Sequence, residues 1–575
     1  MDGGGRQKER AGWVKAQVKE HSSGRKEKKH LQSPGSWNHH HGESGKYKIS
    51  APPSTAGRAS SPNASTTDGT PYDSEMDTSW ILDQTTSMTD FTPASSLAAM
   101  SGGTPAALTG TSAQLSPANS PNEFEFEPGL VSLYLDYVFP FLNPFYAPRL
   151  IEGGRGWLLV VLMRNKALLH AALSLTSYVF SVALSQDDEA GVHDTCKQHA
   201  WESLPKQQEL SMRELQADIQ ELDKRGVKGY MKESTQVMSS VVQQLLFETA
   251  VGNTGNWQIH LDAASVLFEQ IMEHHGTDAD GLPAWHLLLI QLQGSPTTPT
   301  PIPQKTPWRA DQAALRFVTA SLIFFDVLAA TALEQAPRLQ KYHQHILAAP
   351  EQNSAGHELI PPKLRLDMKD FVGIENWILL AIGSIAALDS WKKEMKASNS
   401  LSITQLVTRA GSIECNLRTK IPTLDLPPPP SPPPHAFDPA VRPDQPRPNA
   451  VSRIWAQAAL TYLAIVVSGW QPRSPEIRVS VTLTLAMMRA LPSPACLRTV
   501  VWPLCVTGCV AEREEEAGIR NMVASMDTAQ AFGTTTEAMK IMEEVWANRE
   551  RIGESPDSWD VAACLKSLGH PALLK

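Results

Sequence analysis

The chain has 575 residues, six of them Cys, and its 60 Asp and Glu outnumber 51 Lys and Arg to give a formal net charge of −9. This balance excludes a protein that is basic throughout, although a local basic segment could still contact nucleic acid. Six cysteines without a paired framework exclude a disulfide-stapled secreted domain, so we expect a soluble, intracellular protein.

The first segment, 1–48, is predicted to be a basic arm. It carries eleven Lys or Arg against five Asp or Glu, in a pattern typical of a solvent-exposed helix. No apolar run follows, so the segment is not a secretory signal. Its basic cluster RKEKK could contact nucleic-acid phosphates or act as a nuclear import signal, while a plain solvated charge run is the alternative. The cluster consists of Arg25, Lys26, Lys28 and Lys29.

The next segment, 49–127, is predicted to be a disordered acidic linker. No Lys or Arg occurs from 59 to 148, whereas ten acidic residues lie between Asp68 and Asp136. Ser, Thr, Pro, Gly and Ala dominate, and such a composition cannot offset the entropy cost of ordering. The acids keep bulky side chains such as Trp80 hydrated and available to a partner. Two interpretations therefore stay open: an inert linker and an acidic-hydrophobic activation segment.

The remaining residues, 128–575, are predicted to form one large all-α domain. LVSLYLDYVFPFLNPFY (130–146) is dense in aromatic residues, and we expect its prolines to break it into short pieces. The run 157–184 is apolar nearly all round, as in a single buried helix. No run alternates with period two between hairpin turns, so we expect no sheet.

Helical periodicity continues to the end of the sequence. Further helices are predicted at about 237–252, 257–276, 310–334, 375–395, 402–419, 450–470, 475–490, 497–527 and 532–550. Large aromatic side chains are usually well buried, so four tryptophans are expected in the core. They are Trp257, Trp308, Trp377 and Trp502.

Two proline-rich insertions, 295–307 and 426–448, interrupt the helices and should be extended surface loops. The second insertion could dock an SH3- or WW-type domain, although a spacer is the simpler interpretation. Two uncharged runs, Ala167–Gln186 and Ile454–Trp470, approach membrane-spanning length. The first contains several polar residues and the second is short, so we interpret both as core helices and expect no membrane partner.

The sequence shows no catalytic or metal-binding signature such as GxGxxG, a P-loop, HExxH or GxSxG. DADG (278–281) lacks the ligand series of a calcium loop and is predicted to be a turn. The three histidines at 39–41 have no Cys nearby and are interpreted as a solvated polar run. Cys505 and Cys509 lie one helical turn apart without a third ligand, so we interpret them as core thiols. We therefore expect no enzyme and no cofactor in this chain.

Five segments, taken together, resemble one group of fungal transcription factors. MDGGGRQKERAGWVKAQVKEHSSGRKEKK resembles the stretch directly after that group's zinc cluster, where Trp-Met-Asp-Gly-Gly leads into a basic helix. Four further blocks are similar to the fungal-specific transcription factor domain: 130–146, 314–337, 373–393 and 498–512. The acriflavine sensitivity control proteins belong to this group. On these blocks, in this order, the chain is identified as a member of the family.

The resemblance also exposes a departure. The family's DNA reader is a six-cysteine module that binds two zinc ions and directly precedes the Met-Asp-Gly-Gly stretch, where this sequence begins. The chain's own six cysteines are scattered and cannot substitute, because zinc ligands must converge at about 2.3 Å. Two explanations stay open: the cluster is encoded upstream of a misassigned start, or the protein has lost it. Zinc is expected only in the first case.

The resemblance implies a nuclear regulator of RNA polymerase II transcription with a helical regulatory domain. That domain could host homo- or heterodimerisation, effector response and contacts to the transcription machinery. With a zinc cluster the protein would read promoter DNA in the major groove. Without one, the arm alone would bind DNA non-specifically, with Kd about 10⁻⁴–10⁻⁶ M, so the protein would act as a co-regulator through protein contacts. An all-α enzyme or ligand-binding protein of unrelated chemistry is the third interpretation, and a pocket with convergent ionisable groups would favour it.

Overall fold

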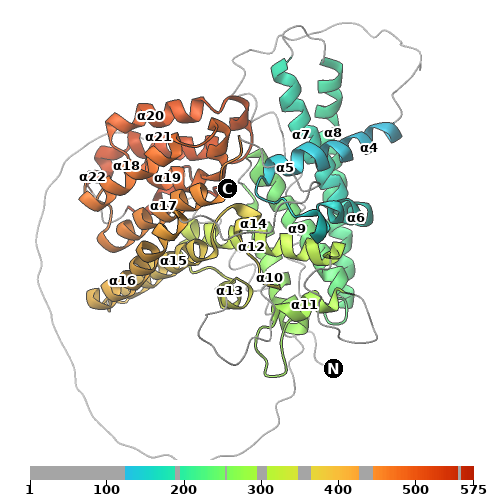
Figure 1. Ribbon diagram of the computed structural model, residues 1–575, viewed down its shortest axis with the longest axis horizontal. Helices are drawn as coiled ribbons and strands as arrows, with labels where there is room; N and C mark the ends of the chain where they lie inside the picture. The colour runs from blue at the N-terminus through green and yellow to red at the C-terminus, as the bar shows by residue number, and fades with distance from the viewer. Residues whose placement is uncertain are drawn as a thin grey trace, which may run out of the picture. The chain divides into compact units, whose positions relative to one another are not determined.

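The fold is known from a computed structural model, which describes residues 123–187, 194–252, 255–293, 307–347, 364–425, 444–554 and 559–575 (Figure 1). All of them belong to one compact unit, residues 74–575. Every element in these ranges is helical, apart from an isolated β-bridge between Thr277 and Pro283. The prediction of an all-α domain is therefore confirmed. The basic arm, nearly all of the acidic linker and most of both proline-rich insertions lie outside the described residues.

The first part of the domain runs from α4 to α14. Its elements are α4 (Glu123–Leu133), η2 (Tyr134–Val138), α5 (Phe139–Leu142), η3 (Leu150–Glu152), α6 (Gly156–Arg164), α7 (Lys166–Asp187), α8 (Asp194–Arg225), α9 (Met231–Val251), α10 (Trp257–His275), α11 (Trp285–Gln291), α12 (Ala310–Leu333), α13 (Gln340–Ile346) and α14 (Lys369–Val372). The second part runs from α15 to the C-terminal segment. Its elements are α15 (Asn376–Ala397), α16 (Ile403–Lys420), η5 (Ile421–Asp425), α17 (Pro448–Ser468), α18 (Pro475–Arg489), η6 (Pro494–Thr499), α19 (Val501–Cys509), α20 (Arg513–Ala524), η7 (Asp527–Ala531), α21 (Thr535–Ala547), α22 (Arg549–Glu554) and α23 (Val561–Leu565).

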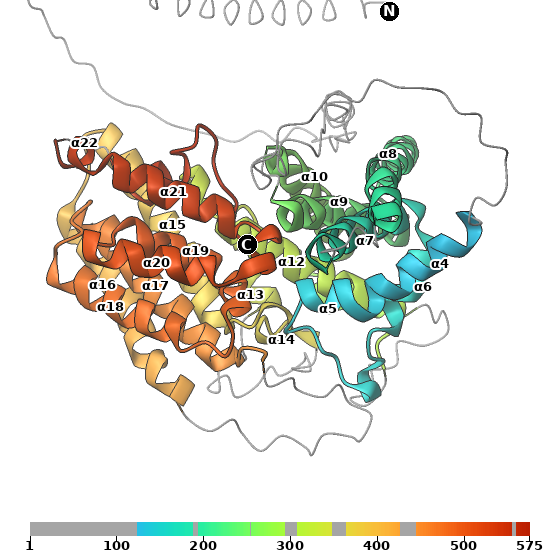
Figure 2. The same ribbon diagram turned by 90° about the horizontal axis from the view of Figure 1, so that it is seen from above.

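Helix α12 joins two groups of helices. In Figures 1 and 2, α4–α11 lie on one side of it and α15–α22 on the other. It packs against α6, α9 and α10 of the first group and against α15 and α23 of the second. Every residue from Gln312 to Ala332 except Arg316 is buried. A helix that is apolar all round must be enclosed on all sides, so α12 forms the centre of the core.

Three helices, α7, α12 and α17, are long and apolar enough to cross a membrane by length and composition alone. Within the domain, however, 67%, 94% and 72% of their apolar windows are buried against other parts of the protein. Packing inside the domain therefore accounts for these apolar sequences. This agrees with the interpretation of Ala167–Gln186 and Ile454–Trp470 as core helices.

The prediction of one helix over 157–184 is wrong, because Asn165 divides the run into α6 and α7. Asn165 adopts an extended backbone conformation with ψ 107°. Its Oδ1 accepts the main-chain N–H of Leu168 at 2.9 Å, and its Nδ2 donates to Ser240 Oγ at 2.8 Å. This side chain thus caps α7 and ties the break to α9. Hydrophobic periodicity could not reveal the break, since both sides of it are apolar.

The prediction of one helix over 497–527 is also wrong. The chain there forms η6, α19 and α20. Helices α19 and α20 are separated near Glu512, which is extended with ψ 167°. The Oε2 atom of Glu515 accepts the main-chain N–H of Glu512 at 2.9 Å. This reciprocal bond is one half of a capping box, which starts α20 independently of α19.

The prolines of 130–146 break the chain less than expected. Helical structure continues from α4 through the π-turn η2 into α5, and Pro140 lies in the first turn of α5. Within η2, Phe139 N–H bonds to Tyr134 O, a spacing of five residues, and this wider turn precedes the proline. The helical run ends at Asn143, directly before Pro144, where a proline disfavours helical geometry in the preceding residue.

The four predicted core tryptophans divide into two kinds. Trp257 and Trp502 are 1% exposed, as predicted. Trp308 and Trp377 pack against the core but are only partly buried, so the prediction holds for them in part. Cations cover their rings: Arg316 lies 4.4 Å from the Trp308 ring centroid, and the Lys420 ammonium lies 5.9 Å from that of Trp377.

Candidate functional site

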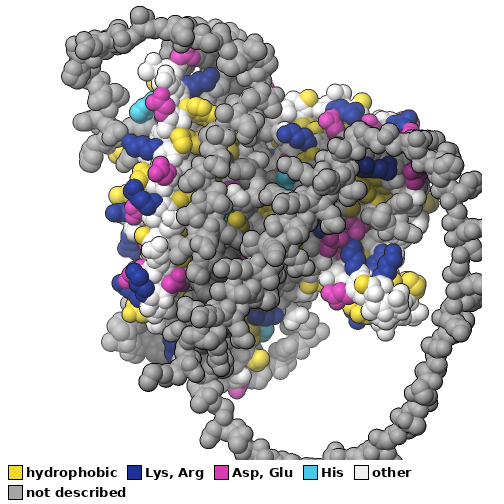
Figure 3. Space-filling view, turned by 180° about the vertical axis from the view of Figure 1, so that it is seen from behind, with side chains coloured by type: hydrophobic (Ala, Val, Ile, Leu, Met, Phe, Trp, Pro, Cys, Tyr) yellow, Lys and Arg dark blue, Asp and Glu magenta, His cyan; other side chains and the backbone are white. Residues whose placement is uncertain are grey.

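The predicted phosphate-contacting residues Arg25, Lys26, Lys28 and Lys29 lie outside the described residues, so their role stays a prediction. On the face of the helical domain drawn in Figure 3, basic and acidic side chains are intermixed where the side chains are coloured. At the end of α8, for example, Glu221 pairs with Arg225 at 2.5 Å and with Lys224 at 3.8 Å. Such local pairing neutralises cations that could otherwise bind nucleic-acid phosphates.

The other polar motifs are structural. Among the described residues, no group of three or more His, Cys, Asp or Glu could hold a metal ion. Asp278 Oδ1 accepts the N–H groups of Asp280 and Leu282 at 3.0 and 2.9 Å, so DADG is a turn, as predicted. Cys505 and Cys509 are buried free thiols, with their sulfur atoms 3.9 Å apart, in agreement with their interpretation as core thiols.

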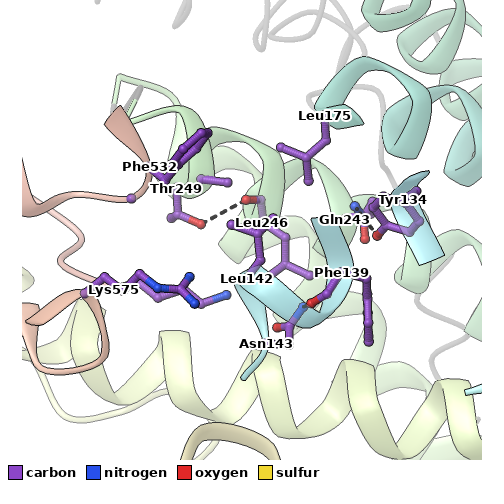
Figure 4. A pocket seen from close by; sticks show the side chains of 13 residues that line it. Tyr134, Phe139, Leu142, Asn143, Leu175, Gln243, Leu246, Thr249, Phe532 and Lys575 are labelled. Carbon is purple, nitrogen blue, oxygen red and sulfur yellow. Dashed lines mark hydrogen bonds between the residues drawn. The ribbon is translucent and has the colours of Figure 1, made fainter. Parts of the chain in front are cut away.

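One cavity brings together segments from the beginning, middle and end of the helical domain (Figure 4). It has a volume of about 60 Å³, measured as the space open to the centre of a water molecule. Its walls come from η2 and α5, from α7 and α9, and from η6, the segment 532–533 and Lys575. In Figure 4, Phe532 and Lys575 approach from one side, while Leu175, Gln243 and Tyr134 lie on the other.

Much of the wall is apolar and held by aromatic packing. Phe532 meets Phe141 edge to face, with ring centroids 5.1 Å apart, and meets Tyr178 at 5.8 Å. On the opposite wall, Phe139 packs edge to face with Tyr146 at 6.0 Å. Edge-to-face pairs stabilise beyond the area they bury, so these rings give the cavity a fixed shape.

The neutral polar groups of the wall are bonded within the wall itself. Gln243 Nε2 donates to the hydroxyl of Tyr134 at 3.3 Å, and Asn143 Nδ2 donates to Phe139 O at 3.1 Å. Thr249 Oγ1 donates back to the carbonyl of Leu245, one turn earlier in α9, at 3.0 Å. These groups are satisfied without a ligand.

The cavity also contains two half-buried cations, Arg498 and Lys575. The Arg498 guanidinium lies over the ring of Phe141, 3.8 Å from its centroid, and the Lys575 ammonium lies 5.1 Å from the centroid of Phe325. Among the described residues, no Asp or Glu side chain forms an ion pair with either cation. Aromatic faces attract cations, but they do not supply a counter-charge.

The pKa values of both cations are lowered, chiefly by burial. Burial, and then the neighbouring positive charge of Arg498, lower the pKa of Lys575 to about 7. Burial likewise lowers the pKa of Arg498 to about 10. Both effects disfavour the charged forms, so the fold holds two like charges near each other at a cost in free energy.

The backbone around Lys575 is fixed from two directions. Lys575 N–H donates to Thr534 Oγ1 at 2.9 Å, and the same hydroxyl donates to Lys575 O at 3.1 Å. Gly533 N–H donates to Ala250 O of α9 at 2.8 Å, and its φ of +81° is a conformation that favours glycine. The segment thus anchors Lys575 against α9.

The comparisons with known proteins decide the family. The family model described as "Fungal specific transcription factor domain" matches residues 129–574. The chain belongs to this family. A comparison with solved structures finds no match.

The relatives are regulators of transcription. The chain is 37% identical over 458 residues to transcription factor dibT of Pestalotiopsis microspora, covering 78% of this chain and 70% of that protein. It is 28% identical to the trichothecene biosynthesis transcription regulator TRI10 of Trichoderma arundinaceum, covering 78% of this chain and 98% of that protein. It is 26% identical to the ustiloxin B cluster transcription factor ustR of Aspergillus flavus, covering 79% and 75%. The resemblance seen in the sequence is therefore confirmed, and the protein is a regulator of transcription in this family.

Sequence reasoning missed the cavity of the fungal domain. Arg498 opens the block 498–512, and Lys575 is the last residue of the sequence, but neither stands in a recognisable motif. Their partners in the wall, such as Tyr134, lie hundreds of residues earlier in the sequence. Only the packing of the helices brings these side chains together.

Proposed function

We propose that the protein is a nuclear regulator that controls RNA polymerase II transcription of a set of biosynthetic genes through promoter DNA. The observation that carries this proposal is the match of the fungal domain to residues 129–574, together with relatives named as regulators of biosynthesis. The family is one of transcription factors, and we propose no catalytic role. We also propose that it works with the transcription machinery and as a homo- or heterodimer.

In this proposal the basic arm and a zinc cluster share the binding of DNA. The arm over 1–48 contacts phosphates through RKEKK, and each neutralised phosphate releases counterions and adds salt-dependent affinity. Specific reading of bases needs a zinc cluster whose cysteines would precede Met1. Among the described residues, no group of three or more His, Cys, Asp or Glu could hold such a zinc ion.

A second candidate function is a co-regulator that works only through protein contacts. The alignments cover 98% and 96% of the TRI10 regulators of Trichoderma arundinaceum and Fusarium sporotrichioides. Those regulators therefore extend little beyond the part that matches this chain. Relatives that consist almost entirely of the matching part favour regulation by the shared domain alone.

The experiment is deletion of the gene combined with chromatin immunoprecipitation of the tagged native protein. We expect loss of transcripts from a group of neighbouring genes and enrichment of their promoters in the nuclear fraction. Transcript loss without sequence-specific binding of the purified native protein to those promoters would favour the co-regulator. Unchanged transcripts together with exclusion from the nucleus would overturn both candidates.

A matched variant tests the arm. Replacing Arg25, Lys26, Lys28 and Lys29 by Gln removes four positive charges outside the helical domain. We expect lower promoter occupancy, or loss of the tagged protein from the nucleus, with normal protein abundance. Replacement of four exposed basic residues by Gln, at Lys224, Arg225, Lys228 and Lys232, serves as the charge-matched control on the domain surface.

A further inference from the structure

Two half-buried cations, Arg498 and Lys575, line the cavity of the helical domain. Removing a charge from water is costly unless an opposite charge or hydrogen-bond acceptors replace the water. Burial and the charge of Arg498 lower the pKa of Lys575, and no side-chain carboxylate of the described residues pairs with either cation. Titratable groups perturbed in this way, and placed in a cavity, are typical of binding sites.

The protein's own groups do not resolve this imbalance. The amides of Gln243 and Asn143 and the hydroxyl of Thr249 already hydrogen-bond within the wall. The ring of Phe141 offers Arg498 a cation–π contact, which stabilises a charge without neutralising it. One anionic group placed between the two cations would relieve both the desolvation and their mutual repulsion.

The rest of the cavity wall favours an apolar group in the part of the ligand that does not contact the cations. Beyond the cations, the cavity is lined by Phe139, Leu142, Leu175, Leu246 and Phe532. Apolar walls with a few convergent charged groups are the usual composition of small-molecule sites. The space, about 60 Å³ for the centre of a water-sized sphere, admits a small organic molecule rather than a chain or a nucleotide.

We propose that this cavity binds a small apolar carboxylate, with its carboxylate group between Arg498 and Lys575 and its apolar part against the Phe139 and Phe532 walls. A guanidinium and an ammonium together can donate several charge-assisted hydrogen bonds to one carboxylate. The inference goes beyond the proposed function, and the binding does not depend on it.

The position of the cavity gives such a ligand a regulatory consequence. Its walls join η2 and α5 at the start of the domain to η6 and Lys575 at the end. A ligand that binds only the folded arrangement stabilises the contacts among these segments, by mass action. The occupancy of the cavity would therefore set how firmly the first and last segments of the domain are held together.

The test uses the purified full chain, without DNA, and three probes. Thermal unfolding and isothermal calorimetry are measured with benzoate, with its neutral isostere benzamide, and with acetate, which keeps the charge but lacks the ring. We expect benzoate to raise Tm and to bind, and benzamide to do neither. Acetate should bind more weakly than benzoate because it forgoes the apolar walls.

Variants assign the binding to the two cations. Lys575→Met and Arg498→Gln should each weaken benzoate binding about tenfold to a hundredfold, as expected for losing a hydrogen bond to a charged group. Arg473→Gln, which changes a side chain that is 93% exposed, should bind benzoate as the wild type does. Circular dichroism checks that each variant is folded, and Lys575→Met retains most of the side chain's volume.

Several results would overturn the proposal. Equal responses to benzoate and benzamide would show that the cations do not select a charge. Acetate binding more tightly than benzoate would exclude an apolar acid. A folded Lys575→Met variant that binds benzoate like the wild type would place the binding elsewhere. None of these outcomes bears on promoter binding, so failure here leaves the proposed function untouched.

Discussion

Two cationic sites in the same domain differ in how their charge is balanced. Lys393 of α15 lies 2.7 Å from Glu334, 2.9 Å from Asp389 and 2.7 Å from Asp560. Burial acts to lower the pKa of Lys393, but the carboxylates outweigh it and the net shift is upward. At Arg498 and Lys575 burial prevails. Lys393 is thus surrounded by acids, whereas no described Asp or Glu side chain pairs with the two cations in the cavity.

Substituting Lys393 would break the balanced site and should give the largest effect. Lys393→Met leaves the carboxylates of Glu334, Asp389 and Asp560 near one another without their shared cation. We expect the free energy of unfolding to fall by about 2–3 kcal/mol, less than for a fully buried pair because Lys393 is partly exposed. Urea denaturation measures this loss.

Lys228→Met, which removes an exposed cation, is the control and should change stability by less than about 0.5 kcal/mol. A Lys393→Met variant as stable as that control would show that the network of α12, α15 and α23 contributes nothing net.

In contrast to the Lys393 site, the cavity should make the free energy of unfolding depend on pH through Lys575. The pKa of Lys575 is lowered to about 7 in the fold, so between pH 7 and its unfolded pKa the unfolded chain binds one more proton. Stability therefore rises with pH in this window, by at most about 1.4 kcal/mol per pH unit. The other titratable groups in the wall are Arg498 and Tyr134, and burial raises the pKa of Tyr134 above its ordinary value.

The measurement compares the free energy of unfolding of the wild type and Lys575→Met from pH 6.5 to 8.5. We expect the wild type to gain about 1–2 kcal/mol relative to the variant across this range. Parallel pH profiles would mean that Lys575 titrates normally and that its charge costs the fold nothing.

Introducing a carboxylate into the cavity should change stability less than the substitution of Lys393. It would give the cavity's cations a carboxylate nearby, as Lys393 already has. Asn143→Asp supplies a carboxylate in the same wall as Arg498 and Lys575, at the loss of the amide bond to Phe139 O. Because these two consequences oppose each other, we expect a net stability change within about 1 kcal/mol. Benzoate binding should weaken about tenfold, since the internal carboxylate competes with the ligand.

The matched change Asn548→Asp introduces the same charge on α21's C-terminal cap, away from the cavity. Its benzoate affinity should equal that of the wild type. Undiminished binding by Asn143→Asp would argue against an anion held between the two cations.

The sequence predicted the parts of this fold that depend on local periodicity. Helices α12 and α15–α18 lie close to their predicted ranges, because long apolar stripes mark a helix strongly. The breaks at Asn165 and Glu512 escaped prediction, since each depends on a side-chain cap rather than on the apolar pattern. The resemblance at 130–146 identified the family, but it did not reveal that Tyr134 and Phe139 line a cavity.

The cavity could not be predicted because its chemistry is distributed along the chain. Arg498 and Lys575 are ordinary basic residues in the sequence, and no described Asp or Glu side chain pairs with either. What distinguishes them is that no side-chain carboxylate among their described neighbours from other helices pairs with them. A sequence shows which residues are present, whereas a missing counter-charge is visible only in three dimensions.

The most direct test of the account is proton uptake on benzoate binding at pH 8, measured by calorimetry of the full chain in two buffers with different ionisation enthalpies. A carboxylate beside Lys575 should restore its proton, so we predict uptake of about one proton per ligand bound. Lys575→Met should bind more weakly and take up none. Equal binding heats in the two buffers for the wild type would contradict the claim that Lys575 is an unbalanced cation awaiting an anion.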